Sequence, residues 1–279
     1  MFLQIEPLPF IYTFAVPVFF FWVLISIITM LLMDMKMLNK KTTILIYVIN
    51  ILFSGVLFGG FPNALMPIQQ VLIIIGGRGI ISSLLPVLII LGLLLASSFM
   101  VGRIFCGFAC PLGALQELLS KIKFKSDLGT QKRVKSRIKV SNKIISIVRW
   151  SFFSLIFLLA GVWSVAILQE FNPILGFYFY NTPLSITLIP LISLIFVIIV
   201  SIFIYRPWCR LLCPFGTGSS LCGRFSRINY HRTKNCTECG LCEKVCPTNE
   251  AFRGIKKGEC YYCNRCIDIC PNDAIKFME

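Results

Sequence analysis

Cys236-Thr-Glu-Cys239-Gly-Leu-Cys242-Glu-Lys-Val-Cys246-Pro247 is the first of two stretches that share one spacing of cysteines. The second is Cys260-Tyr-Tyr-Cys263-Asn-Arg-Cys266-Ile-Asp-Ile-Cys270-Pro271. Three closely spaced thiolates cover one face of an iron–sulfur cubane, and where two such runs occur the fourth ligand comes from the other run. The spacing therefore predicts two [4Fe–4S] clusters. Their expected ligands are Cys236, Cys239, Cys242 and Cys270 for the first cluster, and Cys260, Cys263, Cys266 and Cys246 for the second.

Zinc and disulfide bonds are the alternatives for these cysteines. Zinc takes four ligands in two pairs, which leaves the third cysteine of each run and the Cys-Pro ending unexplained. Disulfides need an oxidising compartment, whereas the charge pattern below places this segment inside the cell. A segment this short buries too little apolar surface to fold alone. The clusters are therefore expected to form its core, as structural metals do in other small domains.

The rest of the chain has the composition of a polytopic membrane protein. Of its 279 residues 57% are hydrophobic, and the mean hydropathy is +0.82. The formal charge of +15 would suggest nucleic acid as the partner of a soluble protein. Here basic loops that face anionic lipid account for it, so membrane lipid, and no nucleic acid, is the expected partner.

Five apolar runs are long enough to cross a bilayer: 10–33, 43–58, 80–105, 144–168 and 184–205. Between the second and third, residues 59–79 are interrupted by glycine and proline, and their apolar part, 64–75, is too short to cross easily. That part is expected to form a helix on the outer surface or a re-entrant helix.

The basic residues fix the predicted orientation. Of the 27 Lys and Arg residues, 24 lie in three segments: 3 just after the first span, 9 in the loop 120–143 and 12 from residue 206 onward. Since basic loops stay in the cytoplasm, we expect the N-terminus outside and the C-terminus in the cytoplasm of a multi-pass protein of the cytoplasmic membrane. The basic loop is expected to face solvent or lipid, the alternative being a docking surface for an acidic redox partner.

An internal repeat follows the third and fifth spans. Arg103-Ile-Phe-Cys106-Gly-Phe-Ala-Cys110-Pro111-Leu-Gly113 matches Arg206-Pro-Trp-Cys209-Arg-Leu-Leu-Cys213-Pro214-Phe-Gly216. Both stretches lie where a helix reaches the cytoplasm, so the repeat is parallel, about an axis along the membrane normal. In a helix, cysteines at i and i+4 share one face, and proline suits a helix end or the first turn of the next helix.

The four repeat cysteines are therefore predicted to converge into an additional redox or metal site. Cys106, Cys110, Cys209 and Cys213 could hold a third iron–sulfur cluster or another soft metal, or act as redox-active thiols. Arg103 and Arg206 are expected to favour thiolates there. The alternative is that these cysteines are buried, small helix-end residues.

With these motifs the chain resembles the NapH-type membrane polyferredoxins, a family that includes the membrane part of NosR and the CcoG-like proteins. The resemblance covers most of the chain: residues 103–113 and 206–216, the Phe171-Asn172-Pro173 loop and the two cysteine runs, in that order. It implies a cytoplasmic-membrane protein that moves electrons between a quinol pool, or another donor, and a partner reductase or maturation system. The chain departs from NosR in showing no flavin-binding domain, and it has Asn264 where the first run has Gly240.

The predicted architecture is a transmembrane helical domain, residues 1–232, followed by a small α+β two-cluster ferredoxin domain, residues 233–279. The predicted function is electron transfer from a quinol or membrane donor to a soluble or peripheral redox partner protein, with quinone as a further cofactor to consider. An electron carrier is favoured over a stand-alone enzyme, because no nucleophile–base pair or hydrolytic constellation is visible. The alternatives are a factor that reduces or handles copper during respiratory-complex assembly, and a structural iron–sulfur subunit of a membrane complex.

Overall fold

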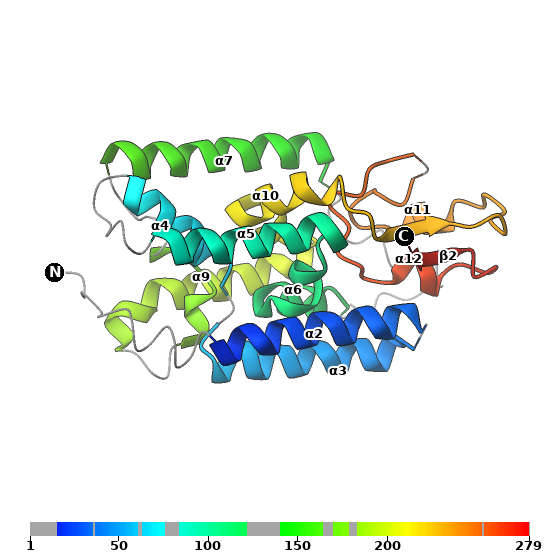
Figure 1. Ribbon diagram of the computed structural model, residues 1–279, viewed down its shortest axis with the longest axis horizontal. Coiled ribbons are helices and arrows are strands. Elements are labelled where there is room, and N and C mark those ends of the chain that lie inside the picture. Colours follow the sequence, from blue (N-terminus) through cyan, green and yellow to red (C-terminus); the bar gives the residue numbers. More distant parts are fainter. Residues whose placement is uncertain are drawn as a thin grey trace.

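The computed structural model describes residues 16–35, 37–60, 63–75, 84–121, 140–163, 170–178, 183–252 and 254–278. In these ranges the protein is mostly helical, and its long helices run along the long axis of the molecule (Figure 1). The two short strands and the last two helices lie together at one end (Figure 1). The predicted basic loop falls largely outside the described residues, as do the N-terminal part of the first span and the last part of the fourth.

Three helical stretches are long and apolar enough to cross a membrane, among the residues that the structure describes: Lys40–Leu57, Asn142–Ala160 and Ser185–Phe203. They belong to α3 (Lys40–Asn50) with its π-helical continuation η2 (Ile51–Leu57), to α7 (Asn142–Trp163) and to α9 (Leu184–Phe203). Two further apolar helices, α2 (Val16–Asp34) and α5 (Leu84–Val101), coincide with the first and third predicted spans. Their described apolar parts, Phe20–Asp34 and Val87–Val101, are shorter. The membrane character is thus visible, while the count of five spans stays a prediction.

Large apolar side chains cover the outside of these helices, as lipid requires. Phe20, Leu45, Leu85, Ile147 and Phe196 are each roughly half exposed or more. Polar side chains in the helices point inward instead, where several hydroxyls donate to the carbonyl four residues earlier, such as Thr29 to Ile25 and Ser201 to Val197. This inversion of the usual pattern is expected where the solvent is hydrocarbon.

The broken segment after η2 forms one short helix, α4 (Leu65–Ile75), whose first turn is capped by the Asn63 side chain. It packs against α5 and α7. A 3₁₀ turn, η6 (Leu175–Tyr178), packs on α9. Gly176 is required there, because a Cβ would come within 2.8 Å of the Pro190 carbonyl oxygen.

The predicted repeat is built twice from the same three elements. In the first copy α5 leads into a π-helical turn, η4 (Phe105–Ala109), and then α6 (Pro111–Lys121). In the second copy α9 leads into η7 (Trp208–Leu212) and then α10 (Pro214–Gly223). This arrangement replaces the single helical face that we expected for each cysteine pair.

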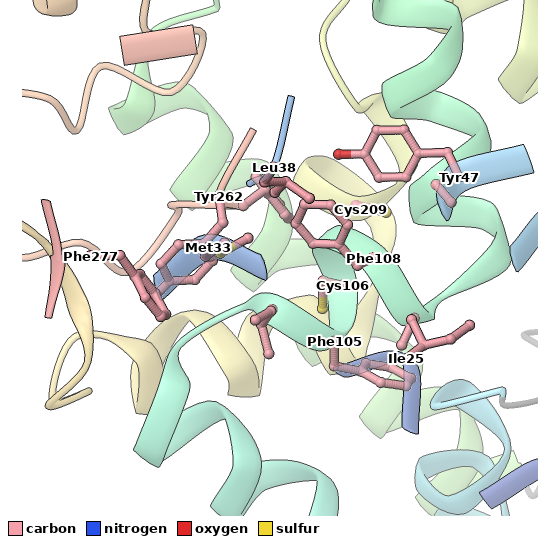
Figure 2. Packing of buried hydrophobic residues seen from close by; sticks show 14 of the residues in the cluster. Ile25, Met33, Leu38, Tyr47, Phe105, Cys106, Phe108, Cys209, Tyr262 and Phe277 are labelled. Atoms are coloured by element: carbon pink, nitrogen blue, oxygen red, sulfur yellow. The ribbon is translucent and has the colours of Figure 1, made fainter. Parts of the chain in front are cut away.

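The C-terminal segment holds β1 (Asn229–Arg232), α11 (Leu241–Val245), α12 (Arg265–Asp268) and β2 (Ile275–Met278). The strands pair antiparallel with Tyr230 opposite Phe277. Since β1 lies before residue 233, the predicted domain boundary cuts this sheet. The segment shares its core with the helices: Tyr262 and Phe277 belong to the same buried cluster as Phe105 and Phe108 (Figure 2).

Candidate metal centres

Each Cys-Pro motif folds as a π turn followed by a capped helix. In the first motif the backbone N–H of Cys110 donates to the Phe105 carbonyl five residues earlier, at 2.9 Å. Cys110 itself is extended, and Pro111, which has no N–H to donate, starts α6. The first cysteine of each pair therefore lies in a π turn and the second at the start of the next helix. Cys213 takes the usual place of serine or aspartate as N-cap and accepts from the Gly216 N–H at 3.3 Å.

The two motifs are bonded to each other through their arginines. Arg206 donates to the Cys106 carbonyl at 2.7 Å, and Arg103 donates to the Gly216 carbonyl. Both guanidinium groups are completely buried. The conserved spacing to glycine in both copies has a steric reason: a Cβ at Gly113 would overlap the Cys106 carbonyl, and one at Gly216 would come within 2.6 Å of the Cys209 carbonyl.

The four repeat thiols lie in one region between the copies. The Gln116 side-chain amide of α6 donates to the Cys209 sulfur at 3.3 Å, and the Ser219 hydroxyl of α10 lies 3.9 Å from the Cys106 sulfur. Each helix thus serves the first cysteine of the other copy. Cys106 and Cys209 are buried within one cluster (Figure 2), and Cys110 and Cys213 pack against it.

Burial controls the protonation of these thiols. It raises the pKa of Cys209 to about 11, although Arg206 lowers it in turn. The pKa of Cys110 is raised by burial and also by the charges of the other three thiolates. The arginines therefore act in the direction predicted, but burial outweighs them. A metal that binds here must displace protons from thiols.

Two buried carboxylates balance the arginines. The Glu117 carboxylate on α6 accepts hydrogen bonds from Tyr205 Oη at 2.6 Å, Arg206 Nε at 3.0 Å and Arg265 Nη2 at 2.9 Å. Burial alone would raise the pKa of Glu117, but Arg265 and Arg206 lower it to about 2.

Glu259 is the counterion of Arg103, as Glu117 is of Arg206. It pairs with Arg103 at 2.9 Å and with Arg149 at 2.6 Å, and it accepts from the Ser220 hydroxyl at 2.6 Å. Arg149, near the start of α7, is buried in this pair.

The cysteines of the tail gather around two cavities. One is lined by Cys236, Cys239, Cys242 and Cys270, and the other by Cys246, Cys260, Cys263 and Cys266. These are the two sets of four that the spacing predicts. Left-handed residues, Gly240 with φ 70° and Asn264 with φ 61°, turn the chain between the second and third cysteine of each run. The replacement of glycine by asparagine thus keeps the same backbone.

The chemistry of both donor sets fits an iron–sulfur cluster. Each iron of a cubane takes one thiolate, so four thiols around a common space are what such a cluster needs. Backbone N–H groups point at the sulfurs, as from Ala274 to Cys270 at 3.3 Å. In the described part of the chain no three His, Cys, Asp or Glu side chains are arranged to share a single metal ion.

Tyr261, between the first two cysteines of the second run, connects the tail with the repeat site. Both buried arginines lie over its ring, with the guanidinium carbon of Arg206 at 4.3 Å and that of Arg103 at 4.8 Å from the ring centre. Its backbone carbonyl packs on Gly107, where a Cβ would approach it to 2.6 Å. The loop that begins at Cys260 and lines the second cavity therefore packs against the two Cys-Pro motifs of the repeat.

Glu117, Glu259 and Tyr261 were not singled out from the sequence. Glu117 follows Arg103–Gly113 closely, and Ser220 occupies the same offset after the second motif. The signal in the sequence is that Glu117 in one copy corresponds to Ser220 in the other. It can be interpreted only from the structure, which shows the tail residues that these two side chains contact.

Comparison with known proteins gives two matching family models. A model described as a 4Fe-4S binding domain matches residues 83–129 and 186–232, each of which contains one Cys-Pro motif of the repeat, and a second 4Fe-4S binding model matches residues 230–249. No solved structure matches the chain.

Several relatives are similar over most of this chain. An uncharacterised protein of Methanocaldococcus jannaschii is 32% identical over 72% of this chain and 81% of its own length. The putative electron transport protein YccM of Escherichia coli is 27% identical over 62% of this chain and half of its own length. The ferredoxin-type protein NapH of Haemophilus influenzae is 27% identical over 63% and 62%. These likenesses support an iron–sulfur electron-transfer role in a membrane.

Proposed function

Because the chain belongs to the NapH- and NosR-type family of ferredoxin-type membrane proteins, we propose that it passes electrons between a quinol or another membrane donor and a partner reductase. In this proposal the ferredoxin segment lies on the cytoplasmic side of a multi-pass protein, as the distribution of basic residues favours. The partner is a soluble or peripheral redox protein.

The contact between Tyr261 and the repeat site carries the proposal. It joins a four-thiol cavity in the tail to a four-thiol region that follows α5 and α9 through the packing of one buried side chain, since Tyr261 is 2% exposed. A protein that used its clusters only to hold a fold together would not need a second donor set packed directly on the first.

The cluster ligands in this proposal are three sets of four cysteines. The tail holds two [4Fe–4S] clusters on the sets that line its two cavities, and the third set is Cys106, Cys110, Cys209 and Cys213. The 4Fe-4S description of the model that matches both repeat copies supports an iron–sulfur cluster as the occupant of the third set. When bound, such clusters supply one-electron chemistry.

The residues around the third set exclude water and supply fixed charge. Gln116 and Gly216 donate hydrogen bonds to thiols, while Arg103 and Arg206 place two buried cations beside them. Hydrogen bonds to sulfur, net charge and burial are the factors by which a protein sets a cluster potential. This site is therefore expected to differ in potential from the more exposed first tail cluster, whose Cys239 reaches the surface.

Metal content and redox titration test the proposal. Anaerobically purified protein should contain about twelve iron and as many sulfide per chain if three [4Fe–4S] clusters are present. Cys110→Ser and Cys213→Ser, made separately, should abolish the same EPR signal and leave the tail signals in place. Cys222→Ser, a half-buried thiol outside every motif, is the matched control.

Other results would replace the proposal. Stoichiometric copper at the repeat cysteines would favour metal handling. Clusters that are present but cannot be reduced by any quinol or membrane donor would favour a structural subunit. Independent effects of Cys110→Ser and Cys213→Ser would show that the four thiols are not one site.

A further inference from the structure

The two copies of the repeat differ at a few positions that face the tail. An offset of 103 residues pairs Arg103 with Arg206, and the same offset pairs Cys106 with Cys209. By this offset Glu117 corresponds to Ser220, and Gly107 corresponds to Arg210. Both differences lie where residues 258–262, here named the docking strip, contact the helical part.

The first difference concerns charge. In the first copy Glu117 is the counterion of Arg206 from the opposite copy, at 3.0 Å. The second copy has Ser220 in that place and so offers no carboxylate to Arg103. Glu259 of the docking strip supplies it, at 2.9 Å from Arg103, while the Ser220 hydroxyl donates to the same carboxylate.

The second difference concerns space. Gly107 leaves room for the Tyr261 backbone, and Gly102 with φ +65° leaves room for the Tyr262 hydroxyl, which a Cβ would approach to 2.6 Å. In the second copy these positions hold Arg210 and Tyr205, which are too large for such an approach. At the other end of the strip Gly258 lies against α10, where a Cβ would come within 2.7 Å of the Ser220 carbonyl.

The exchange of charge is reciprocal. The tail gives an anion, Glu259, to the first copy's arginine, and it gives a cation, Arg265, to the first copy's carboxylate at 2.9 Å. A buried charge without a partner destabilises the folded protein. The tail and the helical part therefore supply each other's counterions.

From these contacts we infer that Glu259 is a positioning residue: it acts as the carboxylate that the second copy lacks, and so holds the Cys260 loop on the four-cysteine site. The positions at which the copies differ form its docking site. The inference rests on the proposed function only where it gives the docking a role in electron transfer. The packing of the tail on the helices does not depend on that function.

The test compares Glu259→Gln with the double variant Glu259→Gln/Ser220→Glu. Hydrogen–deuterium exchange of the detergent-solubilised protein reports on peptides from the tail and from α6 and α10 separately. Glu259→Gln should speed exchange in both groups by roughly a hundredfold or more, as expected for breaking a buried pair. The double variant restores a counterion to Arg103 from within the second copy but leaves Arg149 of α7 without Glu259. We therefore expect α6 and α10 to recover while the tail and α7 stay unprotected.

Glu243→Gln is the matched control, because its pair with Arg232 lies within the tail and is partly exposed. If Glu259→Gln does not accumulate, Gly107→Ala provides the second variant: it keeps every charge and displaces the strip through the Tyr261 carbonyl. It should loosen the tail more than the helices.

Three outcomes would overturn the inference. Unchanged tail exchange in Glu259→Gln, or in Gly107→Ala where that variant is used, would remove the docking role. If slow exchange returns in the tail as well as in the helices of the double variant, Glu259 only balances the charge of Arg103 and does not hold the tail. No recovery of α6 and α10 would show that position 220 is not the equivalent place. None of these readouts depends on electron transfer, so failure of the proposed function would be seen separately, in the redox titration.

Discussion

Replacing Glu117 by glutamine tests whether the buried charges at the repeat site are balanced as the structure shows. Glutamine has nearly the same shape, so the change removes a charge and leaves the packing in place. Arg206, which is completely buried, would then lose its carboxylate partner, and Arg265 would lose its partner on α6.

Two arguments give the size of the effect. Removing one member of a buried ion pair costs about 3–5 kcal/mol, because the other charge stays buried and unpaired. Independently, a carboxyl whose pKa falls from 4.5 to about 2 on folding stabilises the folded protein by about 3 kcal/mol at neutral pH. In a chain of this size a loss of about 3 kcal/mol lowers the Tm by about 6–12 °C.

The sign of the pH dependence follows from the same shift. Since the folded-state pKa lies below the unfolded one, the stabilisation is fully present above about pH 5 and is lost as the pH falls towards 2. The difference between wild type and Glu117→Gln should therefore be the same at pH 6 and at pH 8.

Thermal unfolding in detergent, followed by tryptophan fluorescence at both pH values, measures the effect. Glu243→Gln removes a partly exposed pair and should cost below about 1 kcal/mol. The reasoning fails if Glu117→Gln unfolds within 2 °C of wild type, which is roughly the shift for less than 1 kcal/mol. It also fails if the difference changes between pH 6 and pH 8.

Four further predictions can be checked independently. Cys246→Ser and Cys260→Ser should damage the same cluster, since both residues line one cavity, and EPR signals lost from two different clusters would refute the crossed ligation. Gly113→Ala should lower the Tm by several degrees because its Cβ overlaps the Cys106 carbonyl, whereas Gly92→Ala, with open space around it, should not; equal effects would remove the steric argument. Reporter fusions after Asn181 and after Glu279 should lie on opposite sides of the membrane, and a common side would disprove the topology. A chain cut within residues 122–139 and co-expressed as two fragments should copurify, because each repeat copy satisfies the other's arginine; fragments that stay apart would argue against that dependence.

The cysteine spacing predicted which thiols line each cavity of the tail, because the spacing within each run and the order of the two runs are read directly from the sequence. The two sets of four that line the cavities need only the order of the cysteines and a turn at Gly240 and Asn264. The repeat was visible for the same reason, since two identical spacings follow two apolar runs. The prediction that each cysteine pair shares one helical face was wrong. Proline after the second cysteine cannot donate a backbone hydrogen bond. The first cysteine of each pair instead lies in a π turn, and the second ends that turn just before the next helix.

The ion pairs of Glu117 and Glu259 could not be predicted, because each joins residues far apart in the sequence. Glu117 sits on α6 among residues that read as an ordinary amphipathic helix, and its partners come from α9's end and from the tail. Likewise the predicted domain boundary placed residues 229–232 with the transmembrane helices, and only the pairing of β1 with β2 shows that they belong to the tail's sheet. Periodicity reports which face of an element is buried, but not which distant charge meets it.

The contacts of Gln116 with Cys209 and of Ser219 with Cys106 join equivalent positions of the two copies, at the offset of 103 residues, and have a consequence for the ancestry of the chain. Contacts in which one unit's donor meets its partner's acceptor, and the reverse, are those of a two-fold symmetric dimer. A chain of half this length would carry both sides of that contact and two of the four thiols, so it would complete the site by pairing with a second copy of itself. Once two copies are fused, their equivalent positions are free to diverge. Glutamate stands at 117 and serine at 220, so the single tail makes a different contact with each of the two copies.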